Sequence, residues 1–280
     1  MRQARFGLIG HPITHSLSPA LFKAGYDGKY PYELIETADF EEAYSRFLSG
    51  YDGINVTAPF KELAYAKADI LSDECRLIKA TNLLVKTPEG IKAYNSDYLG
   101  VRMWLQEVAA RFSHADSAVL PIGSIRAMIV GLGGAGKAAA VAAASLGMDT
   151  ILMNRSMDKA EAVAERISQL PDAPYTEVRP MDDFRRCFRE ADIIIYNIPA
   201  AVPALQELAS EDFGSDRPKF IMEANYKNPS FSNELIMNMK NTNRMAEYTS
   251  GRTWLLYQAV TGYEIFTGER PDLPLMTAVL

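Results

Sequence analysis

The chain has 280 residues, a length that predicts one large or two medium-sized domains, and its 48% apolar and 23% charged residues are typical of a globular protein. A net charge of −6 argues against general nucleic-acid binding. The chain has two cysteines, far apart, and three histidines, so we expect no metal centre built from these residues and a reducing compartment.

No segment predicts a membrane anchor or a secretory signal. The first ten residues, MRQARFGLIG, contain no apolar run of signal-peptide length. Residues 127–148 are mostly alanine and glycine with Lys137 in the middle, which is a poor composition for a membrane span. We therefore expect a cytoplasmic protein without membrane or nucleic-acid partners.

The first hundred residues alternate strand and helix patterns, which favours a mainly parallel sheet. The predicted strands are 6–10, 32–37 and 51–57, and the predicted helices are 19–26, 39–48 and 61–71. Residues 81–87 and 90–95 flank Pro88-Glu89 and predict a hairpin at one edge of the sheet.

Residues 55–61, NVTAPFK, place a lysine where a strand gives way to a helix. Val56 and Thr57 are β-branched and favour a strand, whereas Pro59 cannot donate to a sheet and ends it. Lys61 then opens a helix just beyond the carboxyl end of the strand, where open α/β sheets usually bind ligands. The alternative is a surface lysine on an ordinary turn.

A second α/β pattern fills the rest of the chain. Residues 98–112 predict an amphipathic helix, and 113–126 lack periodicity and predict a linker. The predicted strands are 126–130, 149–154, 175–178, 192–197 and 219–224, and 251–267 predict a long helix.

Residues 131–136, GLGGAG, follow the strand pattern AMIV and precede an alanine-rich helix. This is the context in which G-x-G-x-x-G binds a dinucleotide, because glycines permit close approach of a pyrophosphate to a helix N-terminus. The alternative is a packing turn. The predicted cofactor-binding residues here are Gly131, Gly133, Gly134, Ala135 and Gly136.

The next predicted strand ends at Asn154 and is followed by Arg155 and Ser156, with Lys159 one helical turn further on. A ribose with a free 2′-hydroxyl usually meets Asp or Glu at this position, whereas arginine suits a 2′-phosphate. The pattern therefore favours NADP over NAD, the alternative being a solvated basic face.

These motifs, in this order, resemble the shikimate dehydrogenase family over nearly the full length. The segments that carry the resemblance are HSLSP (15–19), NVTAPFK (55–61), KATNLL (79–84), YNSDYLG (94–100), GLGGAG (131–136), NRSMDK (154–159) and GRTWLLYQA (251–259). The resemblance implies an α/β fold with a substrate-binding domain, 1–105 plus 250–280, and a Rossmann NADP-binding domain, 106–249. The C-terminal helices return to the first domain.

The resemblance also implies roles for individual residues. Lys61 and Asp97 match the catalytic pair. The implied substrate-binding residues are Ser16, Ser18, Thr57, Asn82, Tyr226 and Gln258. Ser16 and Ser18 would hold the substrate carboxylate, and Asn82 a ring hydroxyl. On the cofactor side, the resemblance adds Ala224, Gly251 and Asp73.

Several of these residues have structural alternatives. Ser18 precedes Pro19 and could cap a helix, and Asp97 could cap the helix predicted at 98–112. Tyr226 and Gln258 could be packing residues, and Asp73 a solvated acid. The chain also departs from the family pattern, with Glu223 for the usual Asp, Trp254 for a Met, and Asn197-Ile198-Pro199 for N-A-T.

The implied reaction is the reversible, NADPH-dependent reduction of 3-dehydroshikimate to shikimate in aromatic amino acid biosynthesis, by a monomer or homodimer that needs no metal. A quinate enzyme with NAD is the nearest alternative, but relatives of that type often carry Thr at the position of Ser18 and an acid at that of Arg155. A non-catalytic NADP sensor would be expected to lose Lys61 or Asp97. A folate-pathway methylene dehydrogenase would lack HSLSP.

Overall fold

The computed structural model describes residues 3–115, 122–214 and 217–280. The chain divides into two compact units: unit 1 is Met1–Gly100 with Leu255–Leu280, and unit 2 is Val101–Trp254. Part of the predicted linker 113–126, namely 116–121, lies outside the described residues. Of the rest, 113–115 end helix α5 (Ser96–Ala115) and Arg126 begins strand β7 (Arg126–Val130). The assignment of one unit to substrate and the other to cofactor stays a prediction.

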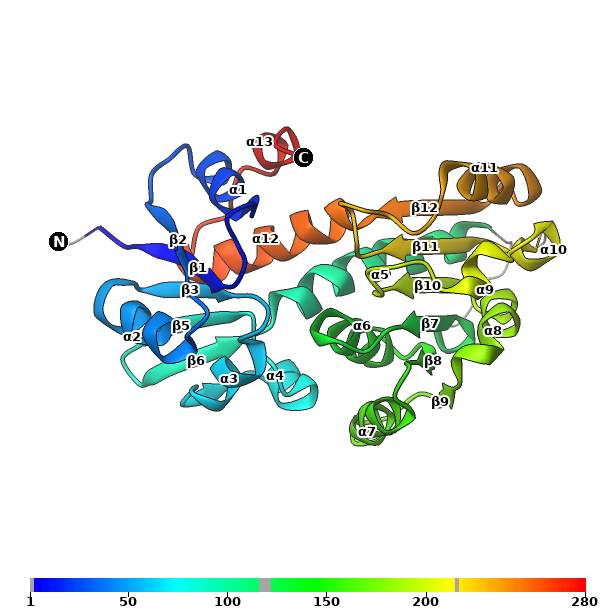
Figure 1. The fold of residues 1–280 in the computed structure, drawn as a ribbon, viewed down its shortest axis with the longest axis horizontal. Coiled ribbons are helices and arrows are strands. Elements are labelled where there is room, and N and C mark those ends of the chain that lie inside the picture. The colour runs from blue at the N-terminus through cyan, green and yellow to red at the C-terminus, as the bar shows by residue number, and fades with distance from the viewer. Residues whose placement is uncertain (1–2, 116–121, 215–216) are drawn as a thin grey trace. The chain divides into compact units, whose positions relative to one another are not determined.

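Unit 1 is built on a six-stranded mixed sheet (Figure 1). Its strands are β1 (Phe6–Gly10), β2 (Tyr32–Glu36), β3 (Gly53–Val56), β4 (Ile70–Leu71), β5 (Leu83–Thr87) and β6 (Gly90–Tyr94), in the order β2-β1-β3-β5-β6-β4. β1 pairs in parallel with β2 and β3, whereas β5 is antiparallel to both β3 and β6. The apolar strand patterns at 6–10 and 51–57 thus form the buried centre of the parallel part.

Helices cover both faces of this sheet. The helices of unit 1 are α1 (Ser18–Gly25), α2 (Phe40–Gly50), α3 (Lys61–Ala66), α4 (Asp73–Ile78) and α13 (Leu273–Thr277), with the start of α5 (Ser96–Ala115) and most of α12 (Gly251–Thr267). Side chains from α2, α3 and α4 form one core with the sheet. Those from α1, α12 and α13 form a second, aromatic core on the other face.

Two predictions for unit 1 are wrong in detail. The helix predicted at 61–71 ends at Ala66, and Ile70–Leu71 form the short strand β4 instead. β4 pairs in parallel with β6, so the hairpin β5-β6 is not at the edge of the sheet. A two-residue strand and the six-residue helix α4 are too short to show a clear period in the sequence.

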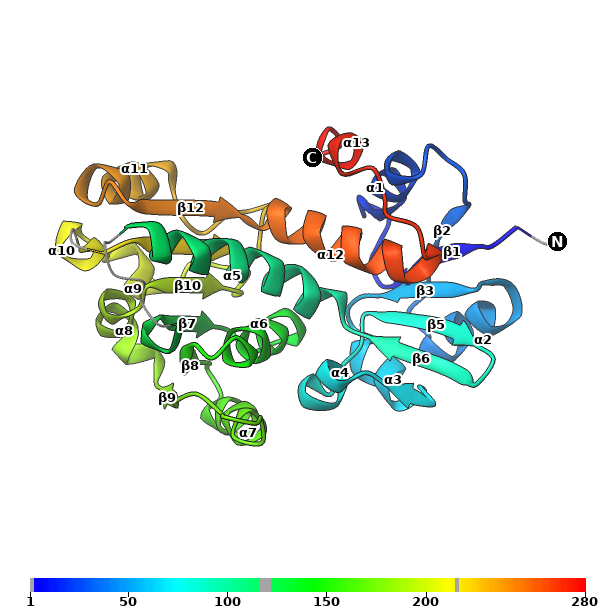
Figure 2. The same ribbon diagram turned by 180° about the vertical axis from the view of Figure 1, so that it is seen from behind.

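Unit 2 contains a fully parallel six-stranded sheet (Figure 2). Its strands are β7 (Arg126–Val130), β8 (Asp149–Met153), β9 (Thr176–Arg179), β10 (Ile193–Tyr196), β11 (Lys219–Glu223) and β12 (Ala246–Ser250). The spatial order β9-β8-β7-β10-β11-β12 is that of a doubly wound dinucleotide-binding fold, in which the order of strand addition reverses between β7 and β10. This confirms the predicted fold class.

The helices of unit 2 pack on the two faces of its sheet. They are α6 (Gly134–Ser145), α7 (Met157–Ile167), α8 (Phe184–Glu190), α9 (Pro203–Gln206), α10 (Ser210–Phe213) and α11 (Asn233–Thr242), with short 3₁₀ turns η1 (Ile122–Ser124) and η2 (Met181–Asp183). Side chains from α8 to α11 form a core with β7, β8, β10 and β11. Among the described residues, no helix is long and apolar enough to cross a bilayer.

Candidate active site and cofactor-binding site

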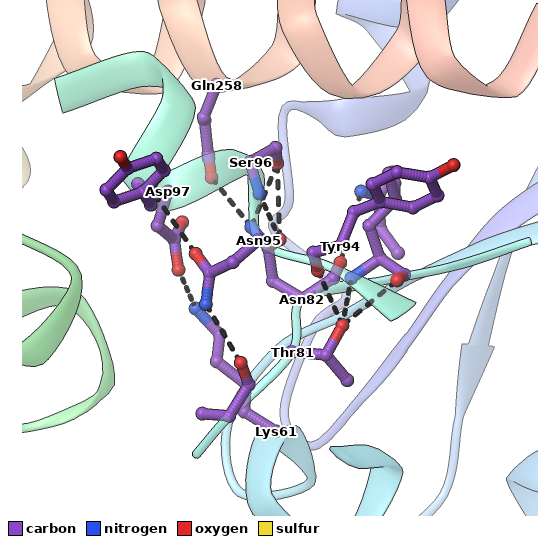
Figure 3. A network of polar contacts seen from close by, with 12 residues as sticks. Lys61, Thr81, Asn82, Tyr94, Asn95, Ser96, Asp97 and Gln258 are labelled. Carbon is purple, nitrogen blue, oxygen red and sulfur yellow. Dashed lines mark hydrogen bonds and ion pairs between the residues drawn. The ribbon is translucent and has the colours of Figure 1, made fainter. Parts of the chain in front are cut away.

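An ion pair between Lys61 and Asp97 lies at the carboxyl end of β3 (Figure 3). Lys61 is the first residue of α3, and Asp97 lies in the first turn of α5. The Lys61 Nζ lies 2.5 Å from Asp97 Oδ2, and the two side chains are 19% and 9% exposed. A charged pair this short and this shielded holds the ammonium in one place while a small opening to solvent remains.

Asn95, and not Asp97, caps helix α5. Its Oδ1 accepts a hydrogen bond from the backbone N–H of Tyr98 at 3.0 Å, and its Nδ2 donates to the Ala80 carbonyl at 3.1 Å. The alternative that Asp97 serves as the cap is therefore wrong. Because Asn95 satisfies the helix terminus, the Asp97 carboxylate faces Lys61 (Figure 3).

Asn82 lies at the centre of a second polar cluster beside this pair. Its Oδ1 accepts from the Ser96 N–H at 2.7 Å, and its Nδ2 donates to Ser96 Oγ at 3.0 Å and to Gln258 Oε1 at 3.4 Å. Asn82 is 4% exposed, so these bonds fix its amide plane. The structure thus brings together two of the predicted substrate residues, from the start of β5 and from α12 (Figure 3).

Ser16 and Ser18 lie together on the loop before α1. Ser16 Oγ donates to Ser18 Oγ at 3.1 Å and accepts from the Ser18 N–H at 3.2 Å. Ser18 is the first residue of the helix and Leu17 occupies the capping position, so the alternative that Ser18 caps the helix is wrong. Both hydroxyls are partly exposed and can meet a ligand.

Thr57 follows the last residue of β3 and is fixed by its backbone. Its N–H donates to the Ile9 carbonyl at 3.0 Å, and its γ-methyl occupies the space that a side chain at Gly10 would need. The glycine that ends β1 therefore makes room for Thr57.

The glycine-rich loop of unit 2 adopts the geometry that its sequence predicts. Gly131 has a φ of +83°, and its N–H donates to the Met153 carbonyl at 2.8 Å. A Cβ at Gly136 would collide with the Gly131 carbonyl oxygen, so only glycine permits this contact between loop and helix. Gly134 and Ala135 form the first turn of α6, whose free N–H groups favour an anion.

A cavity of about 910 Å³ lies against this loop, and its lining suits a dinucleotide. Gly133 borders the cavity, and no atom lies within 4 Å of the place its Cβ would take, so a ligand can approach the backbone. Asn154 joins the two loops at the cavity by accepting from the Leu132 N–H at 3.2 Å and donating to the Ser156 carbonyl at 3.0 Å. The exposed Arg155 lines the same cavity.

The cavity differs from the prediction in two respects. Ser156 and Lys159 are not among the residues that line it, whereas Asn154 and Arg155 are. The sequence reasoning noted Asn197-Ile198-Pro199 only as a departure from the family pattern, and it missed the other lining residues, namely Leu132, Met181, Asp182, Val202, Pro203, Ala204 and Glu207. Their position after the carboxyl ends of parallel strands is the signal that could have identified them.

Ala224 and Gly251 lie against each other in unit 2. A Cβ at Gly251 would collide with the Ala224 carbonyl oxygen, so α12 begins in close contact with the end of β11. Tyr226 follows on the same loop, and burial raises the pKa of its phenol. The fully buried Glu223 carboxylate holds this loop by accepting from the N–H groups of Ser230 and Phe231.

Two further residues complete the set. Asp73 is exposed in the first turn of α4 and belongs to unit 1, so its role toward the cofactor stays a prediction. Trp254, which replaces the usual methionine, lies in the first turn of α12 at the end of unit 2 and is 5% exposed.

Comparison with known proteins gives the same answer for both parts of the chain. The family model described as the shikimate dehydrogenase substrate binding domain matches residues 8–84, and the model described as shikimate / quinate 5-dehydrogenase matches residues 113–224. The shikimate dehydrogenase (NADP(+)) of Maricaulis maris is 30% identical over 282 residues, which cover 98% of this chain and 94% of that protein.

Two solved structures are similar over nearly the whole chain. The Mycobacterium tuberculosis shikimate dehydrogenase has 27% identity and a TM-score of 0.75, covering 99% of this chain and 98% of that one. The Thermus thermophilus shikimate 5-dehydrogenase in complex with shikimate has 25% identity and a TM-score of 0.75, covering 99% and 97%. The similarity therefore extends through both units.

Proposed function

This chain belongs to the shikimate dehydrogenase family, and from that premise we propose that it reduces 3-dehydroshikimate reversibly to shikimate with NADPH. The observation that carries the proposal is the shielded Lys61–Asp97 pair beside the Asn82–Gln258 cluster. A lysine ammonium fixed by a carboxylate beside buried amides is suited to bind a hydroxylated ring and exchange a proton with it.

When bound, NADPH supplies a hydride to the ring carbonyl carbon. The carbonyl oxygen then carries the electron pair of the broken π bond and takes a proton from the Nζ of Lys61. In the reverse direction the neutral amine accepts the proton of the ring hydroxyl. Asp97 holds the Nζ at the reacting oxygen and accepts from a neighbouring hydroxyl of the ring.

The remaining residues of unit 1 bind and orient the substrate. The hydroxyls of Ser16 and Ser18 donate to the carboxylate, and Thr57 faces the ring at the carboxyl end of β3. The amides of Asn82 and Gln258 hydrogen-bond the ring hydroxyls, since an amide can both donate and accept. The role of Tyr226 toward the substrate rests on the family resemblance alone.

The cofactor is held by unit 2. The N–H groups at the start of α6 bind the pyrophosphate, and Gly133 permits its close approach. Arg155 pairs with the 2′-phosphate, which supports NADP over NAD. Asn154 holds the loop that carries Arg155 against the glycine loop by accepting a hydrogen bond from the Leu132 N–H. For Ser156, Lys159, Ala224, Gly251 and Asp73, the role toward the cofactor rests on the sequence pattern and the family resemblance.

The experiment that tests the proposal is nicotinamide absorbance with purified protein, shikimate or quinate, and NADP or NAD, in all four combinations. Reduction with shikimate and NADP, and at least about tenfold slower reduction in the other combinations, is the expected result. Turnover only with quinate or NAD would assign the protein to the quinate branch. NADP binding without turnover in any combination would identify a sensor instead.

A cytoplasmic location and a monomeric or homodimeric state complete the proposal. Cys75 and Cys187 are both buried free thiols, as expected in a reducing compartment. Cell fractionation and sedimentation of the purified protein test these two points.

A further inference from the structure

Two tyrosines of the aromatic core in unit 1 lie near the serine loop, the buried Tyr263 and the partly buried Tyr32. Tyr263, on α12, is 2% exposed, and its hydroxyl donates to the Ser18 carbonyl at 3.0 Å. The Tyr32 hydroxyl, from β2, donates to Asn55 Oδ1 at 2.7 Å. The two rings lie edge to face with centroids 5.9 Å apart. β2 and α12, which are far apart in the sequence, thus bring their two tyrosine rings into contact.

Burial raises the pKa of Tyr32 and Tyr263 well above the ordinary value. Both phenols therefore keep their protons throughout the physiological range. Ser18 is thus held at two atoms, because its carbonyl accepts from the Tyr263 hydroxyl at 3.0 Å and its Oγ accepts from Ser16 Oγ at 3.1 Å.

The aromatic core around them does not need these hydroxyls for packing. Tyr26 and Tyr30 belong to the same cluster, but their hydroxyls point elsewhere, to the carbonyl and the carboxylate of Glu269 at 2.9 and 3.0 Å. A phenylalanine would fill the core equally well, and a buried hydroxyl costs free energy unless it is bonded. The hydroxyls of Tyr32 and Tyr263 are thus directed specifically at the serine loop and at Asn55.

Asn55 extends this arrangement toward the ring-binding amides. It accepts from Tyr32 and donates through Nδ2 to the Asn82 carbonyl at 3.4 Å. Ser18 is therefore held by Tyr263 and the Asn82 backbone by Asn55 and Tyr32, while the two tyrosine rings contact each other edge to face. These contacts limit the movement of the two groups before the substrate arrives.

We propose that Tyr263, supported by Tyr32, is a positioning residue that holds Ser18 in the orientation that receives the carboxylate of the substrate. This inference rests on the proposed function. Neither phenol contacts the reacting carbon, so both act on substrate affinity and on selectivity for a ring carboxylate, and not on proton transfer.

The test compares Tyr263→Phe with Tyr26→Phe, which removes the same group from the same aromatic core. In Tyr263→Phe we expect KM for shikimate to rise about 5- to 30-fold, the range that the loss of one buried hydrogen bond gives, with kcat within about threefold. KM for NADP should not change. Tyr26→Phe should keep wild-type constants for both substrates.

A substrate analogue makes the test specific. For shikimate methyl ester, which lacks the carboxylate charge, Tyr263→Phe should differ from wild type by less than about threefold, so the preference for the acid over the ester falls. Tyr32→Phe should reduce the same preference and provides the measurement if Tyr263→Phe does not fold.

The outcomes separate the two proposals. Normal wild-type turnover of shikimate, with an unchanged KM and an unchanged acid-to-ester preference in both Tyr263→Phe and Tyr32→Phe, overturns the positioning role alone. An equal loss in Tyr26→Phe overturns it as well, because the effect would then be one of core stability. Absence of wild-type turnover with shikimate overturns the proposed function and this inference with it.

Discussion

The Nζ of Lys61 and Oδ2 of Asp97 lie 2.5 Å apart although the two residues are 36 positions apart in the sequence. Lys61 begins α3 and Asp97 lies in the first turn of α5, so the pair exists only because β3, β5 and β6 bring the two helices to one place. The ammonium is held by a charge, and a neutral amide cannot replace that charge.

Asp97→Asn should therefore lower kcat with shikimate and NADP about 10²- to 10³-fold, because a misplaced Nζ transfers the proton poorly. Steady-state kinetics measures this effect. Asp39→Asn is the matched control, because Asp39 is also an acid at a helix start in unit 1 but caps α2. A kcat for Asp97→Asn within threefold of wild type would contradict the role of the pair.

Arg155→Gln should raise KM for NADP about 10- to 100-fold and leave KM for NAD within about threefold, since only NADP carries the 2′-phosphate. Because Arg155 lines the cavity and Lys159 does not, Lys159→Gln should have the smaller effect on NADP. Equal losses for NADP and NAD in Arg155→Gln, or a larger effect in Lys159→Gln, would refute this assignment.

Two glycines of the loop should respond to alanine in opposite ways. Gly136→Ala should lower the free energy of unfolding by about 2 kcal/mol or more, because its Cβ meets the Gly131 carbonyl oxygen. Gly133→Ala should fold normally, because nothing lies within 4 Å of its Cβ, yet bind NADP at least tenfold more weakly, since the methyl enters the cavity. Urea denaturation and calorimetric titration measure the two effects. Tight NADP binding by Gly133→Ala would show that the pyrophosphate lies elsewhere.

Lys219, at the start of β11, should make stability depend on pH. Its Nζ donates to the carbonyls of Phe188 and Ala191 at 2.7 and 2.5 Å, and burial lowers its pKa to about 8. Above that pH the unfolded chain, with an ordinary lysine pKa of about 10.4, holds a proton that the folded chain lacks. The contribution of Lys219 to the free energy of unfolding therefore increases as the pH rises from about 8 to about 10, and decreases as the pH falls through the same range.

The measurement is the free energy of unfolding of the wild type minus that of Lys219→Met at pH 7.5, 8.5 and 9.5. This difference should increase by about 1–3 kcal/mol from pH 7.5 to pH 9.5, since one proton difference between the two states changes the free energy of unfolding by about 1.4 kcal/mol per pH unit. Subtracting the value for the variant removes the contribution of all other titrating groups to the pH dependence. A difference that stays constant with pH would mean that the carbonyl acceptors keep the ammonium charged despite its burial.

The parts of the fold that the sequence predicted well depend on local requirements. The glycine loop needs a backbone with positive φ at Gly131 and no side chain at Gly136, and both needs are visible in the residue types. By contrast, β12 was missed because only Ala246 of its five residues is buried, so this edge strand shows no apolar run. The helix α13 is too short to show a period.

The candidate site, too, could be predicted from the sequence only in part. Sequence order and family resemblance pointed to Lys61 and Asp97, but Asn95 and Asp97 are both residue types that cap helices, and only the structure shows which of them does so. Most residues that line the cavity after β9 and β10 come from loops without a motif, and at Asn197-Ile198-Pro199 the chain departs from the family pattern. The contact of Tyr263 with Ser18 joins residues 245 positions apart, and no local pattern encodes it.

The most direct test of the whole account is the rate of NADP reduction by shikimate in Lys61→Ala, measured beside Lys67→Ala. Lys67 follows the same helix and also pairs with a carboxylate, that of Glu41, but on the surface. We predict that Lys61→Ala loses at least about 10³-fold in kcat while still binding NADP, and that Lys67→Ala keeps the wild-type rate. Wild-type kcat in Lys61→Ala would contradict the assignment of Lys61 as the proton donor, and with it the mechanism proposed for this chain.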